Sequence, residues 1–296
     1  MATVAAEQRQ IVKPPDSIAA KIGRVATHAP VHLLLAFIGV LWLVPTIGLF
    51  LTSLMKPEVI GTTGWWKVLS QPHLFAWTNY SNLFHNTSIP ATLRITAEIA
   101  IGGTILPIIV AASAAYAFAW MEFPGRDWLF VLVIALLVVP LQMALIPIFT
   151  LYNKLHLFDT VFGLILFHTA FALPFAIFLL RNFFIGIPRD LLEAARIDGA
   201  SEFRIFVRLI LPLGLPAIAS LAIFQVLFVW NDFLVGFTLA QDNVPITAAL
   251  AGQLRQFSSN LSVIAPASFF SAVIPLTVFA LFQRYFVQGL LAGAVK

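Results

Sequence analysis

Six long stretches of this chain carry no charged residue, and this feature restricts the possible folds more than any other. They are residues 25–55, 99–121, 128–153, 160–180, 209–231 and 256–283. Each reaches the length of about 20 apolar residues that crosses a hydrocarbon core. Only 10% of the residues are charged, against about 25% in soluble domains. We therefore predict an all-α polytopic membrane protein with six transmembrane helices.

A seventh uncharged stretch, residues 68–93, differs from the other six in its content. It is rich in Ser, Asn and His, and burying such groups without partners costs several kcal/mol each. We predict that it is a loop. With six spans both termini lie on one side, and that side holds twelve of the 17 Lys and Arg residues. Because positive charge favours the cytoplasm, we expect both termini to be cytoplasmic. The expected domains are an N-terminal tail at 1–30 and a transmembrane domain at 31–296.

The segment 181–208 between the fourth and fifth spans is unusually charged, with nine of the chain's 30 charged residues. Pro188 suits the first turn of a helix, and Gly199 suits its end because glycine adopts positive φ without strain. Ser201 is placed to cap a second helix. The segment predicts two short amphipathic helices at an angle. Such a pair suits either a groove on another protein or the surface of the lipid.

The same segment carries a recognisable motif. Glu193-Ala-Ala, three residues, Gly199, nine residues and Leu209-x-Leu-Pro212 resembles the signature loop of binding-protein-dependent ABC importer permeases. Other resemblances point to the carbohydrate branch of this family, and the ending resembles the second membrane subunit of maltose-type importers. The segments that carry these resemblances are Asn86-Thr87, Ala115-Tyr-Ala-Phe118, Val139-Pro-Leu-Gln-Met143, Trp230-Asn-Asp232 and the ending, 283–296.

The resemblance implies the maltose-type ABC permease fold and a multi-pass protein of a bacterial or archaeal cytoplasmic membrane. It implies a sugar substrate, such as a di- or oligosaccharide, delivered by an extracytoplasmic binding protein. It also implies a homologous second permease and a cytoplasmic ATPase dimer on which the loop docks. The residues assigned to this coupling are Glu193, Ala194, Ala195, Asp198, Gly199 and Ala200.

The predicted outer loop between the fifth and sixth spans is rich in hydrogen-bonding side chains. In maltose-type second permeases the corresponding loop reaches into the binding protein, so the resemblance implies a similar contact here. The residues concerned are Gly252, Gln253, Arg255, Gln256, Phe257 and Ser258. The alternative is a solvated connector.

The chain lacks the sequence patterns of an ATPase. No Lys follows a Gly, so there is no Gly-Lys-Ser/Thr phosphate loop, and the chain has no Cys. We expect no enzyme activity, cofactor, metal or nucleic-acid partner for this chain, with ATP and Mg²⁺ bound by the ATPase subunit. The sequence does not identify the residues of the solute path.

Two other functions remain open from the residues alone. One is a permease for another polar solute, such as glycerol phosphate. The other is an ion-coupled secondary transporter, which would need unpaired carboxylates within the membrane. Glu98 is the one intramembrane candidate, and Arg94, four residues earlier, is placed to neutralise it. A lone His168 in the fourth span suits a core histidine or a pathway contact.

Overall fold

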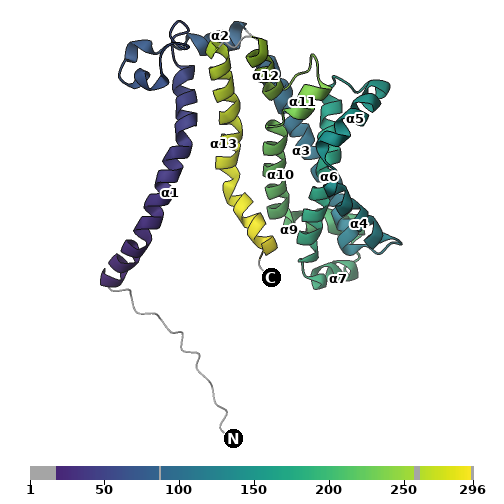
Figure 1. The fold of residues 1–296 in the computed structure, drawn as a ribbon. Coiled ribbons are helices and arrows are strands. Elements are labelled where there is room, and N and C mark those ends of the chain that lie inside the picture. Colours follow the sequence, from purple (N-terminus) through teal and green to yellow (C-terminus); the bar gives the residue numbers. More distant parts are fainter. Residues whose placement is uncertain (1–17, 87, 257–260, 295–296) are drawn as a thin grey trace. The chain divides into compact units, whose positions relative to one another are not determined.

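The computed structural model describes residues 18–86, 88–256 and 261–294, and the regular structure in these ranges is helical (Figure 1). The β-type pairing within them is an isolated antiparallel bridge between Met55 and Phe75. The predicted all-α class is confirmed. The chain divides into two compact units, Met1–Gly48 and Leu49–Lys296.

Most of the first unit is the N-terminal helix α1 (Ile18–Ser53). Its apolar part, Ala29–Ser53, is long enough to cross a membrane. The helix begins before residue 30, where the predicted tail was expected to end. Residues 18–28 include three Ala, one Lys and one Arg, which favour a helix. The earlier part of the predicted tail, residues 1–17, lies outside the described residues.

The second unit contains three further helices of membrane-spanning length. These are α3 (Ile89–Trp120), α6 (Val161–Ile185) and the part Leu261–Gln283 of α13 (Leu261–Ala294). Two bent pairs of shorter helices also have the composition of a span. If each bent pair is one span, the described residues contain six, which is the predicted number. What differs from the prediction is the shape of the third and fifth spans.

The predicted third span is broken at Pro140. Helix α4 (Arg126–Ala135) continues into the 3₁₀ turn η3 (Leu136–Val138), and α5 (Leu141–Leu155) then leaves at an angle of 99°. A proline disfavours helical geometry in the residue before it. Val139 accordingly has extended φ and ψ values of −68° and 113°, so the helix cannot run straight through this position.

The predicted fifth span, 209–231, is also bent. Helix α8 (Glu202–Ile205), the π-helix η4 (Phe206–Ile210) and α9 (Leu211–Leu213) precede α10 (Leu215–Trp230), and the bend is 72°. Gly214 lies at the bend, where an added Cβ would be 2.6 Å from the Phe184 ring. The bend therefore depends on a residue without a side chain.

The uncharged stretch 68–93 has no spanning helix of its own and ends in the first residues of α3, but it is more regular than the predicted loop. It holds part of the 3₁₀ turn η1 (Trp65–Leu69), the turn η2 (Pro72–Leu74) and helix α2 (Thr78–Asn86). The Asn79 amide donates to the carbonyl oxygens of Ser53 and Met55 at 3.0 and 2.7 Å. These bonds satisfy carbonyl groups at the end of α1 and hold α2 in place.

Helix α3 packs along α6 and α10 in the centre of the second unit. An added Cβ on Gly103 of α3 would lie 3.2 Å from Cβ of His168 on α6, so the two helices approach closely. The Gln225 amide of α10 donates to the Gly103 carbonyl oxygen at 3.1 Å. A directional bond thus adds to packing in the apolar interior.

The two ends of this bundle carry different short helices (Figure 1). Helix α7 (Arg189–Ile197) lies at one end, and α11 (Leu234–Leu239) and α12 (Ile246–Gln256) lie at the other. Each end has its own cluster of buried apolar side chains. The one beside α7, here the α7-side cluster, includes Tyr116, Phe184, Leu192, Ile205 and Leu221.

Candidate functional site

The charged segment folds into two short helices, α7 and α8, as the sequence predicted. The Ser201 hydroxyl oxygen accepts a hydrogen bond from the Arg204 backbone N–H at 3.4 Å, so the predicted N-cap is confirmed. Gly199 has a φ of +78°, the left-handed conformation predicted for the residue that ends α7. We call α7, the turn after it and α8 the two-helix module.

The six residues predicted for coupling come together on one turn of this module. They are Glu193, Ala194, Ala195, Asp198, Gly199 and Ala200. The backbone N–H groups of the last three donate to carbonyl oxygens near the end of α7, each at 3.0 Å. Ala195 and Ala200 are half-buried, and the other four are exposed. Glu193 pairs with Arg189 at 2.9 Å. The turn is thus rigid and presents a surface of small side chains.

Two fully buried apolar residues anchor the module. Leu192 and Ile205 are fully buried in the α7-side cluster. Leu191 and Phe203 of the same short helices are exposed, Phe203 to 76%. Ile197 is exposed to 86%. Large apolar side chains beside the rigid turn are therefore available to a partner.

A polar network that the sequence did not predict ties the module to α3. The Tyr116 hydroxyl donates to one carboxylate oxygen of Glu202 at 2.5 Å. Arg196 Nε donates to the other oxygen at 2.9 Å. This hydrogen bond raises the pKa of Arg196 above its usual range. Tyr116 belongs to a motif that carries the resemblance, but its partner is 86 residues away, so spacing gave no sign of the pair.

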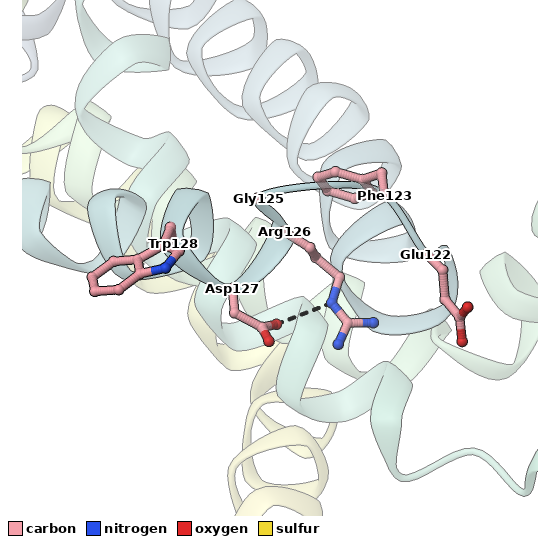
Figure 2. Close-up of a pocket in the computed structure, with 6 residues that line it drawn as sticks. All are labelled: Glu122, Phe123, Gly125, Arg126, Asp127 and Trp128. Carbon is pink, nitrogen blue, oxygen red and sulfur yellow. Dashed lines mark hydrogen bonds and ion pairs between the residues drawn. The ribbon is translucent and has the colours of Figure 1, made fainter.

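The connection between α3 and α4 lies near the same end of the bundle and forms an open hollow of about 350 Å³. Its lining residues are Glu122, Phe123, Gly125, Arg126, Asp127 and Trp128 (Figure 2). Figure 2 shows the ion pair between Arg126 and Asp127, whose atoms are 3.0 Å apart, and the Trp128 ring pointing away from it. Small-molecule sites bury most of their ligand. An open hollow with paired charges does not provide such a site.

The residues predicted to contact a binding protein lie on or beyond α12. Gly252 and Gln253 are half-buried, and an added Cβ on Gly252 would meet nothing within 4 Å. Arg255 and Gln256 belong to the last turn of α12. Phe257 and Ser258 lie outside the described residues. The structure therefore brings the first four onto one helix.

Asp159, which the sequence analysis did not single out, holds the turn that leads into α12. One carboxylate oxygen accepts hydrogen bonds from the backbone N–H groups of Gln241, Asp242 and Asn243 at 2.8, 3.0 and 2.9 Å. The Asn243 side-chain amide donates to the Asp159 carbonyl oxygen at 2.7 Å. Partial burial acts to raise the pKa of Asp159, but the three N–H donors outweigh burial and lower this pKa.

The remaining charged candidates are paired or buried. Arg94 Nε lies 2.8 Å from a Glu98 carboxylate oxygen, and both side chains are exposed. His168 is buried in α6, with its Nε2 atom 3.9 Å from an Asp232 carboxylate oxygen. Within the described ranges, no group of three or more His, Cys, Asp or Glu side chains is placed to hold a metal ion.

Comparison with known proteins gives a family match over most of the chain. Residues 103–291 match the family described as "Binding-protein-dependent transport system inner membrane component". The osmoprotective compounds uptake permease protein GgtD of Synechocystis sp. is 44% identical over 273 residues, covering 90% of this chain and 92% of that protein. The alpha-glucoside transport system permease protein AglG of Rhizobium meliloti is 46% identical over 233 residues.

The alignment with AglG covers 76% of this chain and 61% of that longer protein. A solved structure also has the same fold. It is a bacterial ABC transporter involved in the import of the acidic polysaccharide alginate, matched with a TM-score of 0.74 and 23% identity. The match covers 92% of this chain and 99% of the matched chain.

The role of Asp159 predicts a pH-dependent contribution to stability. Because its folded-state pKa is below the usual value near 4, its carboxylate stabilises the fold above pH 4, and this contribution is lost as pH falls through the folded-state pKa. Asp159→Asn keeps one acceptor but loses the charge. We expect it to destabilise the protein by about 1.5–3 kcal/mol at pH 7, the range for hydrogen bonds to a charged group.

Thermal unfolding of the detergent-solubilised protein between pH 3 and pH 8 measures this effect. The difference in unfolding midpoint temperature between Asp159→Asn and the native chain should become smaller below about pH 4. Asp242→Asn is the matched control, since Asp242 takes part in the turn through its backbone N–H. Equal midpoints for Asp159→Asn and the native chain at pH 7 would contradict the role of the carboxylate.

Proposed function

The chain belongs to the family of binding-protein-dependent transport system inner membrane components, and from this membership we propose that it is a permease subunit of an ATP-driven sugar importer. The match over residues 103–291 carries the proposal, because it includes the second half of α3 and all of α6, the two-helix module and α10. The apolar helices and the family indicate a multi-pass protein of the inner membrane. Sequence and fold therefore lead to the same class of protein.

The proposed substrate is a di- or oligosaccharide. One relative is named as an alpha-glucoside permease and shares 46% identity over 76% of this chain. An ion-coupled transporter is less well supported, because Glu98 is paired with Arg94 at 2.8 Å and is not a free intramembrane carboxylate. The alternative is a permease for another polar solute, such as glycerol phosphate. A transport assay with both substrates distinguishes it from a sugar permease.

The proposed complex contains a second permease, a cytoplasmic ATPase dimer and an extracytoplasmic binding protein. We assign the two-helix module to ATPase contact. Its rigid turn offers small side chains, and Ile197 and Phe203 beside it are exposed. Apolar side chains at such a position suit insertion into a groove on a partner. In this scheme ATP and Mg²⁺ bind to the ATPase, and this chain forms part of the solute path.

We assign the end of α12 and the residues after it to the binding protein. Gly252 and Gln253 lie on α12, and α12 lies at the opposite end of the bundle from α7 (Figure 1). A loop at this end faces the extracytoplasmic side if α7 faces the cytoplasm. Asp159 fixes the turn that precedes α12, so that the contact residues start from a fixed position.

The importer proposal predicts ATP-dependent uptake of sugars by the complex that purifies through a tag on this chain. In proteoliposomes with ATP inside and binding protein outside, we expect uptake of an α-glucoside such as maltose, and little uptake of glycerol 3-phosphate. An uncoupler should leave uptake unchanged while ATP is maintained. If uptake stops with the uncoupler, the driving force is an ion gradient and the proposal fails.

Gly199 offers a test of the module. An added Cβ meets nothing within 4 Å, so a substitution is opposed by its positive φ and not by space within the chain. Gly199→Val should cost about 1–2 kcal/mol in backbone strain and reduce uptake by roughly tenfold. Gly199→Asn is the matched control, since Asn adopts this conformation more readily. Native-like uptake by Gly199→Val would remove Gly199 from the coupling role.

The proposed orientation can be tested by cysteine labelling, because the native chain has no Cys. Ser81 on α2 and Ser201 in the module are both exposed. In sealed spheroplasts that express this chain alone, Ser81→Cys should react with an impermeant maleimide. Ser201→Cys should react after the membrane is permeabilised. The reverse pattern would place the module outside the cell and exclude cytoplasmic termini.

A further inference from the structure

We propose that Tyr116, Glu202 and Arg196 form a tie that passes movement of the two-helix module to helix α3, with Glu202 as its central positioning residue. The proposal rests on the proposed function, in which the module contacts the ATPase. It adds a route from that contact into the transmembrane helices. The route runs through side chains that are far apart in the sequence.

Chain connectivity shows why a tie to α3 matters. Helix α6 leads directly into the module, and η4 and α9 lead from it to α10. Helices α6 and α10 therefore move with the module, because the backbone connects them to it. Helix α3 has no such connection, since it ends at Trp120, well before the module begins. Movement must therefore reach α3 across space.

Tyr116 provides the contact on the α3 side. Its side chain is buried, with 4% of its surface exposed, and its hydroxyl donates to Glu202 at 2.5 Å. Its ring lies 5.2 Å from the Phe206 ring, at an angle of 41°. The apolar contacts of Leu192 and Ile205 in the same cluster have no preferred direction, whereas a hydrogen bond to a carboxylate fixes both distance and direction.

Arg196 provides the contact on the α7 side and joins the two short helices. Its Nε atom lies 2.9 Å from one Glu202 oxygen, and one of its terminal nitrogens lies 3.4 Å from the other. Glu202 is the first residue of α8, so the ion pair closes the turn around Gly199. Glu202 thus receives donors from α7 and α3 at once, and α7, α8 and α3 should move together.

The test compares Tyr116→Phe with Tyr152→Phe in the assembled transporter. Tyr116→Phe keeps the ring against Phe206 and loses the hydroxyl. Tyr152 is similarly buried, at 6%, and its hydroxyl donates to the Gly163 carbonyl oxygen at 3.0 Å, away from the module. Both variants lose one buried hydrogen bond. The readouts are sugar transported per ATP hydrolysed and the stimulation of ATPase activity by loaded binding protein.

We expect Tyr116→Phe to lower transport per ATP at least threefold, while Tyr152→Phe keeps the native ratio. Glu202→Gln should lower the ratio at least as much, and adding Tyr116→Phe to it should change little, because Glu202→Gln already weakens the contact that Tyr116→Phe removes. A native ratio in Tyr116→Phe would overturn the proposal, and so would equal losses in the two tyrosine variants. Uptake by the native complex in the same vesicles reports on the proposed function separately, so a loss confined to the variants concerns the tie alone.

Discussion

The hydrocarbon of a bilayer offers no hydrogen-bond partner to the backbone, so a chain that breaks its helices there must satisfy the freed groups itself. At the two bends found within the described residues, backbone hydrogen bonds persist next to the break. At Gly214, the backbone N–H donates to Ile210 at 2.7 Å, and the carbonyl oxygen accepts from Ile218 at 3.0 Å. At Pro140, the carbonyl oxygen accepts from Met143 at 3.1 Å. The bends are thus built into the fold.

The bend at Gly214 also determines where the two-helix module lies. It turns the chain from α9 into α10, and Gly214 itself packs against Phe184, which belongs to the α7-side cluster. Leu192 and Ile205 enter the same cluster from the module. Displacing the module would therefore disturb the packing of α6 and α10 at this end. A module anchored in this way suits a transporter whose partner has to move the transmembrane helices.

Local features of the sequence predicted local structure well. Gly199 and Ser201 act within a few residues of their own positions, and the sequence indicated both of their conformations correctly. The bends were harder to predict. Pro107 and Pro174 lie inside the continuous helices α3 and α6, whereas Pro140 lies at a 99° bend. Proline permits a break in a membrane helix, and the packing around it decides whether a break occurs.

The contacts that tie distant segments could not be predicted from one sequence. Tyr116 and Glu202 are 86 residues apart, and Asp159 is 84 residues from Asn243. No periodicity or spacing relates such residues, because their distance depends on how the helices pack. The exposure of Phe203 has a similar origin. Helix α8 is one turn long, and Ile205 occupies its buried side, which leaves Phe203 exposed.

The carboxylates of Asp159 and Glu202, at opposite ends of the bundle, accept hydrogen bonds from different kinds of donor. The kind of donor indicates a different role for each. Asp159 accepts from three consecutive backbone N–H groups, so its partners cannot move unless the turn itself changes conformation. Glu202 accepts from a tyrosine hydroxyl and an arginine guanidinium, whose side chains adjust through rotation about their χ angles. Asp159 is therefore suited to a fixed brace. Glu202 is suited to a contact that persists while the helices it joins change their angle.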